Sequence, residues 1–321
     1  MANWRVAHLA SDECGASRSA MKVALISSLA LFTNGAWSGS SNYCQGQTES
    51  NAATQDRLVQ VAAVVKAELD QSGHSVAIVS RSGLALQRFD QRYSHAGVSL
   101  KSSPGIPWSV RQLYYACDEK RPRIFDQGMS GFVMGALDPS EGYVSIVLLP
   151  PAASEALERT ALDEQQALRL LGATYSANAY AFSQRYQNCN QWLAELMATA
   201  WGAPTPVDDP RGTAQAWLRD QDFAPHSFNL GWGPVAWMVG LLPWLHTDDH
   251  PPQNIVDAQY QVSMPSSIEA FVHNHLPDAT RIELCYTPQH IVVHRGWEAI
   301  APGCKPGADD TVAVLAFDTP P

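Results

Sequence analysis

Two short segments carry the residue types that acyl-transfer chemistry requires. RYSHAGVSL, residues 92–100, reads as a β-strand that begins at His95, and RYQNCNQWLAEL, residues 185–196, reads as a helix that begins at Cys189. A helix N-terminus offers unpaired backbone N–H groups and a positive dipole end, which lower the pKa of a thiol and bind an oxyanion. Small residues flank His95 and leave room for a helix end to approach. If the two segments meet, the sequence predicts a cysteine enzyme with His95 as its base.

Each residue also has an ordinary structural interpretation. A single cysteine in an apolar helix is more often a small core residue. A single histidine at the start of a strand is more often a polar edge residue. The pair therefore predicts function only if the fold brings His95 and Cys189 together.

The surrounding elements are predicted from hydrophobic periodicity. Leu58, Val61, Val65 and Leu69 share one face of a helix expected over residues 54–71. Apolar runs predict strands at 75–81, 94–101, 108–116 and 143–150, a charged helix at about 153–171, and a helix from Asn190 to near Gly202. A helix, then clustered antiparallel strands, then more helices is typical of an α+β fold.

The remainder of the chain is less regular. Residues 203–212, APTPVDDPRG, read as a linker or surface loop. Beyond them we expect a short helix at about 266–275 and strands near 280–287, 290–295 and 311–317. Residues 203–321 are either a small subdomain or an elaboration on a core at 39–202, and we favour the elaboration because the linker holds few flexible residues.

The two motifs and their order resemble a known group of enzymes. YSHAGV followed by YQNCNQWLAELMATAWG is similar to the circularly permuted branch of the NlpC-type, papain-like cysteine hydrolases, in which the histidine strand precedes the cysteine helix. Relatives of lecithin:retinol acyltransferase share this order. More narrowly, the chain resembles an uncharacterised bacterial family, domain-of-unknown-function family 2145, which implies no established substrate. The resemblance covers about residues 54–202 and implies a permuted papain-like core with an antiparallel sheet and packed helices.

The resemblance also implies a third polar residue on the next strand, which orients the histidine and fixes its tautomer. Members of the family usually carry a histidine or an acidic residue there, whereas WSVRQ places Gln112 at the matching position. A neutral amide stabilises an imidazolium less than a carboxylate does. Two alternatives stay open: an exposed position for Gln112, and an orienting role for Asp126 in RIFDQG.

Composition narrows the class of partner. The chain has 321 residues, of which 45% are hydrophobic and 16% charged, as in an ordinary globular protein. Its formal charge is -10 and it contains no basic run, so the phosphate backbone of a nucleic acid would be repelled. We therefore expect no nucleic-acid partner.

The N-terminal part indicates export. Residues 21–38, MKVALISSLALFTNGAWS, carry a lysine after a methionine, an apolar stretch too short to span a bilayer, and small residues before Gly39. We expect Met21 to be the true start, residues 1–38 to be removed, and the mature chain to be periplasmic or secreted without a membrane span. A buried N-terminal helix is the alternative.

Cysteine arithmetic agrees with export, because the expected mature chain holds five cysteines and leaves one unpaired. In an oxidising compartment we favour pairs between Cys285 and Cys304, which bracket a hairpin, and between Cys44 and Cys117. Cys189 is then the free thiol. Other connectivities stay open.

Other candidate sites are weaker. HTDDH, residues 246–250, lies in a proline-flanked loop, and HNH, residues 273–275, lies on an expected helix without a compact ligand set. We expect no metal and no cofactor. Neither a phosphate-binding loop nor a serine nucleophile elbow occurs. Trp232, Trp237 and Trp244 are expected in the core, with a sugar-stacking face as the alternative.

Two classes of function follow. The first is an exported cysteine hydrolase, an amidase, peptidase or esterase, with Cys189, His95 and Gln112 as its catalytic residues. The compartment and the resemblance suggest peptidoglycan peptides as substrate, and they leave hydrolysis and acyl transfer both open. The second is a non-catalytic binding or structural protein on a decayed hydrolase scaffold.

Overall fold

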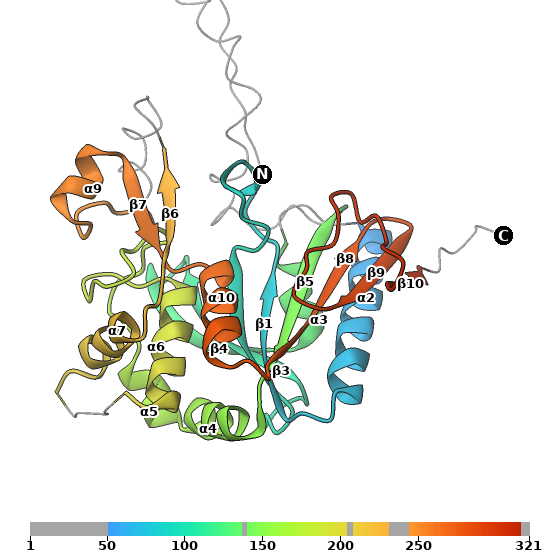
Figure 1. Cartoon of the computed structure of the whole chain (residues 1–321), viewed down its shortest axis with the longest axis horizontal. Coiled ribbons are helices and arrows are strands. Elements are labelled where there is room, and N and C mark those ends of the chain that lie inside the picture. The colour runs from blue at the N-terminus through green and yellow to red at the C-terminus, as the bar shows by residue number, and fades with distance from the viewer. Residues whose placement is uncertain (1–50, 137–139, 204–207, 231–243, 316–321) are drawn as a thin grey trace, which may run out of the picture.

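A single eight-stranded antiparallel sheet organises the computed structural model, which describes residues 51–136, 140–203, 208–230 and 244–315 (Figure 1). The strand order across the sheet is β10-β9-β8-β5-β1-β2-β3-β4. The strands are β1 (Val76–Arg81), β2 (His95–Leu100), β3 (Ser109–Ala116), β4 (Arg121–Gln127), β5 (Gly142–Leu148), β8 (Thr280–Tyr286), β9 (His290–Arg295) and β10 (Thr311–Val314). The predicted α+β class is confirmed.

Helices cover both faces of this sheet (Figure 1). The helices are α2 (Ala52–Gln71), α3 (Met129–Met134), α4 (Pro151–Leu162), α5 (Glu164–Arg169), α6 (Cys189–Trp201), α7 (Pro210–Asp220), α9 (Pro252–Val256) and α10 (Pro265–His275). Successive side chains of a strand point to opposite faces. Val76 and Ile78 of β1 accordingly join the core with α4, α6 and α10, whereas Ala77 and Val79 join the core with α2 and α3.

Helix α2 illustrates how the sequence directs the packing. The predicted stripe of Leu58, Val61, Val65 and Leu69 is buried against the sheet. Burial of such a side chain contributes about 1.5–3 kcal/mol, which is more than helix propensity supplies. At the N-terminus the Asn51 side chain accepts a hydrogen bond from the Thr54 N–H at 2.8 Å, which caps the helix.

The structure corrects two expected boundaries. The helix expected over about 153–171 is two helices, because Asp163 has extended backbone and its carboxylate caps α5 by accepting from the Gln166 N–H at 3.0 Å. The segment expected as a linker ends inside the first turn of α7. There Asp209 accepts from the Gly212 N–H at 2.9 Å and Pro210 occupies the first helical position, where its missing N–H costs nothing.

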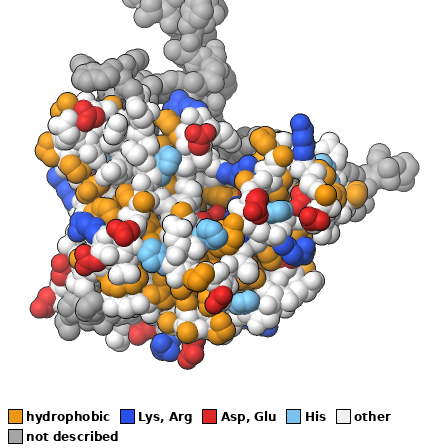
Figure 2. Space-filling view, in the orientation of Figure 1, with side chains coloured by type: hydrophobic (Ala, Val, Ile, Leu, Met, Phe, Trp, Pro, Cys, Tyr) orange, Lys and Arg blue, Asp and Glu red, His pale blue; other side chains and the backbone are white. Residues whose placement is uncertain are grey.

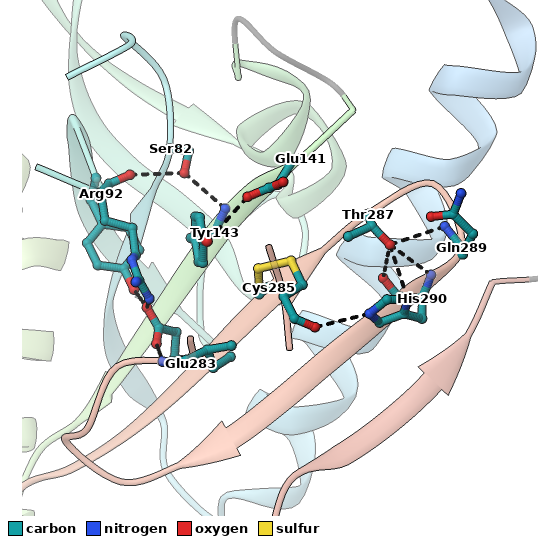
Figure 3. The surroundings of a disulfide bond; sticks show 12 residues. Ser82, Arg92, Glu141, Tyr143, Glu283, Cys285, Thr287, Gln289 and His290 are labelled. Atoms are coloured by element: carbon teal, nitrogen blue, oxygen red, sulfur yellow. Dashed lines mark hydrogen bonds and ion pairs between the residues drawn. A yellow bond between two sulfur atoms is a disulfide. The ribbon is translucent and has the colours of Figure 1, made fainter. Parts of the chain in front are cut away.

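The C-terminal strands extend the same sheet, because β8 pairs with β5 in antiparallel register. The predicted disulfide between Cys285 and Cys304 is confirmed, and it fastens the loop after β9 to β8 (Figure 3). Next to it, the His290 imidazole Nε2 lies 3.2 Å from the Cys304 carbonyl oxygen. Cys117 is also disulfide-bonded, while Cys44, its expected partner, lies outside the described residues.

A separate two-stranded sheet lies beside the main body (Figure 1). It consists of β6 (His226–Asn229) and β7 (Gln259–Val262), which pair in antiparallel register. The expected signal peptide, residues 1–38, lies outside the described residues. Across the part of the chain that the structure does describe, every helix is too short or too polar to cross a bilayer.

Charged side chains are spread over the surface. On the face drawn in Figure 2, acidic and basic groups alternate with hydrophobic and uncharged ones instead of gathering by sign. A nucleic-acid interface needs a basic patch. This face of the described chain offers none.

Candidate active site

A buried ion network fixes the segment that leads into β2. The Glu283 carboxylate on β8 accepts hydrogen bonds from Arg92 at 2.9 Å and from the Ile300 N–H at 2.7 Å, and it also accepts from the Tyr93 hydroxyl (Figure 3). Arg281 donates to the Tyr93 hydroxyl at 2.8 Å. Because buried charges are tolerated only when paired and hydrogen-bonded, this network fixes the positions of residues 92 and 93, which precede His95 by three and two positions.

A second buried network fixes the start of α6. The Glu195 carboxylate accepts from the Gln187 side chain at 2.7 Å and from Arg211 of α7 at 2.9 Å. Gln187 in turn accepts from the Gly172 N–H at 2.7 Å. The loop that precedes α6 is thus bound to the helix it enters. Asn188 then caps the helix, because its side-chain oxygen accepts from the Gln191 N–H at 2.7 Å.

Cys189 is the first residue of α6, as its motif predicts. It is the free cysteine among the described residues, as predicted, and its side chain is 6% exposed. Three backbone N–H groups, those of Asn190, Cys189 and Ala96, favour the thiolate form of its sulfur. Two of them are the unpaired N–H groups of the helix N-terminus. The third belongs to the residue that follows His95.

The expected low pKa of the Cys189 thiol is wrong. Burial raises the pKa of Cys189 to about 11, and this outweighs the lowering by Arg81 and by the three N–H groups. The physical reason is desolvation: a thiolate loses its hydration in the interior, and partial dipoles do not replace all of it. Cys189 is therefore a neutral thiol at pH 7.

His95 begins β2 and is 9% exposed, so it is not the polar edge residue of the ordinary interpretation. Its Nε2 is hydrogen-bonded to the Gln112 side-chain oxygen on β3. The Gln112 amide nitrogen donates to the Gln127 side-chain oxygen at 2.8 Å. That assignment makes the Gln112 oxygen the acceptor, so Nε2 carries the proton and the lone pair of the neutral imidazole lies on Nδ1.

The same contacts bear on the two alternatives. Gln112 is 2% exposed, so it is not a solvent-facing residue of an alternating strand. The Asp126 carboxylate is paired with Arg111, which donates to it at 2.7 and 2.6 Å. Gln112 is therefore the polar side chain of β3 that contacts the His95 ring.

The His95 imidazole is neutral at pH 7. The pKa of His95 is lowered to about 3, mainly by burial and in addition by the charge of Arg81, while the Gln112 hydrogen bond acts in the opposite direction. In the described part of the chain no hydrogen bond joins His95 directly to Cys189. The two elements that carry them are packed against each other, and Asn190, the neighbour of Cys189, donates to the carbonyl oxygen of Ser94, the neighbour of His95, at 3.2 Å.

Sequence reasoning missed two residues that shape this arrangement, Arg81 and Gly97. Arg81 is the cross-strand partner of His95, and its guanidinium donates to the Gly135 carbonyl oxygen at 2.7 Å. The guanidinium and the His95 ring lie 5.4 and 6.0 Å from the centroid of the same Phe132 ring. The available signal was a basic residue ending the apolar strand SVAIVSR.

Gly97 was noted only as a small residue. In the register that pairs Val98 with Arg111, Gly97 lies opposite Gln112. A Cβ at Gly97 would stand 2.6 Å from Val110 Cγ1 and 3.1 Å from Gln112 Cβ. Its absence lets the Gln112 side chain reach across to the imidazole.

The remaining candidates are structural. In HTDDH, the His250 Nε2 lies 2.8 Å from the Asn178 carbonyl oxygen, and in HNH the His273 ring packs 4.2 Å from the Trp297 ring. Within the described ranges, histidine, cysteine and carboxylate side chains do not converge in threes on a possible metal position. Trp244 is buried in the core, whereas Trp232 and Trp237 lie outside the described residues.

Comparison with known proteins assigns the chain to a family. Residues 68–272 match a family described as "Uncharacterized protein conserved in bacteria (DUF2145)". This range contains His95, Gln112 and Cys189 and spans more than half of the 321 residues. Neither a curated protein nor a solved structure matches the chain. Because the family match covers more than half of the chain, the chain belongs to this family of uncharacterized proteins conserved in bacteria.

Proposed function

We propose that this protein is an exported cysteine hydrolase related to the permuted NlpC-type, papain-like enzymes, with Cys189 as nucleophile, His95 as general base and Gln112 as orienter. One observation carries the proposal. The Asn190 side-chain nitrogen, at the helix N-terminus that bears Cys189, donates to the Ser94 carbonyl oxygen at 3.2 Å, so this end of α6 abuts the start of the strand that bears His95. A purely structural cysteine has no need of a histidine whose tautomer is fixed by a buried amide.

The proposed reaction uses each group in the state that the site gives it. The neutral imidazole accepts the thiol proton at Nδ1 as the sulfur attacks an acyl carbonyl carbon, so proton transfer accompanies attack instead of preceding it. The N–H groups of Cys189 and Asn190 stabilise the oxyanion. The imidazolium then protonates the leaving amine or alcohol, which leaves a thioester on Cys189. Water, deprotonated by His95, hydrolyses the thioester and restores the thiol.

Export and substrate belong to the same proposal. The Cys285–Cys304 disulfide is compatible with an oxidising compartment, and residues 21–38 have the layout of a signal peptide. We place the mature protein in the periplasm or outside the cell, where peptide amides of the cell wall are the abundant acyl substrates. Intact-mass analysis of the exported protein should give a chain that begins near Gly39.

One observation favours a second candidate, a binding or structural protein on a decayed hydrolase scaffold. Burial raises the pKa of Cys189 to about 11, whereas reactive cysteines usually have a lowered pKa. In that case the site retains the arrangement of a hydrolase site, but Cys189 no longer acts as a nucleophile.

Activity measurements separate the two candidates. The disulfide-intact protein is incubated with muropeptides and with simple esters, beside Cys189→Ala and Cys189→Ser. The hydrolase proposal expects turnover in the wild type only, with all three proteins folded. Equal rates in the three proteins would contradict it, and absence of turnover on every substrate would favour the binding protein.

A further inference from the structure

Asn190, the second residue of α6, connects the two halves of the candidate site. Its side-chain nitrogen donates to the Ser94 carbonyl oxygen at 3.2 Å. Ser94 precedes His95, and Asn190 follows Cys189. The residue after the nucleophile is therefore bound to the residue before the base, and this bond sets how closely α6 approaches β2.

The other end of the same amide has no hydrogen-bond partner among the residues that the structure describes. Asn190 is 2% exposed, and its side-chain oxygen is buried there without a partner. Asn188, on the other side of Cys189, is fully used: its oxygen accepts from the Gln191 N–H at 2.7 Å and its nitrogen donates to the Ala177 and Ser263 carbonyl oxygens. Burial of an unpaired carbonyl oxygen costs free energy, so an acceptor left open beside a nucleophile calls for a functional reason.

The polarity of the site indicates what this acceptor meets. The groups around the Cys189 sulfur are N–H donors, from Cys189, Asn190 and Ala96, and they suit the carbonyl oxygen of an acyl substrate. An amide substrate also brings an N–H beside that carbonyl, whereas the corresponding ester brings an oxygen without a hydrogen. The Asn190 side-chain oxygen is an acceptor and therefore discriminates between the two.

We propose that Asn190 is a specificity-determining residue that makes the site an amidase: its side-chain oxygen accepts a hydrogen bond from the N–H of the scissile amide. This inference rests on the proposed function. The leaving nitrogen keeps that hydrogen, receives a second one from the His95 imidazolium when its bond to the carbonyl carbon breaks, and departs as an amine. The carbon–sulfur bond of the thioester replaces the carbon–nitrogen bond.

The test uses substrate pairs with the same acyl group and the same leaving side, joined as an amide or as an ester. Asn190→Leu keeps the side-chain volume and removes the acceptor together with the donor to Ser94, and the loss of that donor should affect the amide and the ester alike. Loss of one hydrogen bond to substrate should lower kcat/KM for the amide by about 10-fold or more relative to the ester. Thermal unfolding of each variant verifies that it is folded.

Gln191→Ala is the matched control. Gln191 is a buried amide in the same helical turn, its side-chain oxygen also lacks a partner in the described part of the chain, and its nitrogen donates to the carbonyl oxygens of Tyr180, Ala181 and Ser183. Its loss should lower stability and leave the amide-to-ester ratio unchanged. A ratio that falls equally in both variants would overturn the role given to Asn190.

A modified substrate provides a second test, which compares the wild-type protein with the same variant. An amide methylated at the scissile nitrogen lacks the N–H, so it should be cleaved more slowly than the parent amide by a margin that Asn190→Leu abolishes. An unchanged amide-to-ester ratio in Asn190→Leu, with both activities dependent on Cys189, would overturn this inference and leave the hydrolase intact. Turnover that survives Cys189→Ala would instead overturn the proposed function.

Discussion

The Asn190 side-chain nitrogen donates to the Ser94 carbonyl oxygen at 3.2 Å, so the helix that begins at Cys189 meets the start of the strand that begins at His95. The contact follows from two buried networks, one around Glu283 that fixes residues 92 and 93, and one around Glu195 that fixes the entry to α6.

Cys189→Ala should abolish turnover and leave the fold in place. The side chain is small, so its loss lowers the free energy of unfolding by about 1 kcal/mol, which a 321-residue chain tolerates. The measurement is chemical denaturation beside hydrolysis of muropeptides. A variant that is unstable yet fully active would show that Cys189 is only a core residue.

Gln112→Ala should reduce kcat by about 10-fold to 100-fold, because the imidazole loses the acceptor that fixes its tautomer. It should also lower stability by about 1–3 kcal/mol, since Gln112 is buried and its partners His95 and Gln127 are left unpaired. Gln112→Glu keeps the volume and supplies a carboxylate. Rates equal to the wild type in both variants would remove Gln112 from the site.

The pH dependence of activity follows from the pKa of His95, which burial lowers to about 3. The base is active when neutral, so the acid limb of the rate profile lies near pH 3, well below the ordinary histidine pKa of about 6.5. A carboxylate at position 112 favours the imidazolium and raises this pKa, which moves the limb of Gln112→Glu to higher pH. A wild-type limb already near pH 6.5 would contradict the buried, neutral imidazole.

The same shift predicts a dependence of stability on pH. The pKa of His95 is lower in the folded chain than in the unfolded chain, so the unfolded chain binds a proton more readily. The contribution of neutral His95 to the free energy of unfolding is therefore present above about pH 6.5 and is lost as the pH falls toward about 3. His95→Asn, which does not titrate, should lack this part of the acid destabilisation. Denaturation curves of both proteins between pH 3 and 7 measure the difference.

Gly97→Ala should be destabilising by about 1–3 kcal/mol and should lower activity, because the added methyl group meets Val110 and the Gln112 side chain. Gly105→Ala is the control, since a Cβ there meets nothing within 4 Å. Equal melting temperatures for the two variants would mean that β2 and β3 move apart to accept the methyl group without loss of stability, which would contradict the prediction.

Much of the fold was predictable because it depends on local pattern. The stripe of α2 and the apolar runs of β1, β2, β3 and β5 are visible in the sequence, and the predicted elements there are confirmed. The break at Asp163 was not predicted, because a single extended residue inside a continuous helical pattern leaves the periodicity almost unchanged.

The candidate site was predictable in its residue types and not in its energetics. His95 and Cys189 are recognised by motif, and Gln112 by resemblance, but Arg81 and Gly97 depend on the register of β1, β2 and β3, which hydrophobic pattern does not specify. The prediction of a low pKa for the Cys189 thiol was wrong because two effects oppose each other. The helix N-terminus, which the sequence indicates, lowers this pKa, and burial, which only the fold reveals, raises it by more.

Trapping of the acyl-enzyme tests the central claim most directly. The disulfide-intact protein is mixed with an ester that releases a reporter alcohol, quenched in acid within the first turnover, and analysed by intact and peptide mass spectrometry. The account predicts one acyl group, carried by the peptide that contains Cys189, absent in Cys189→Ala and strongly diminished in His95→Asn. Reporter release without an adduct on Cys189, at a rate unchanged in Cys189→Ala, would contradict it.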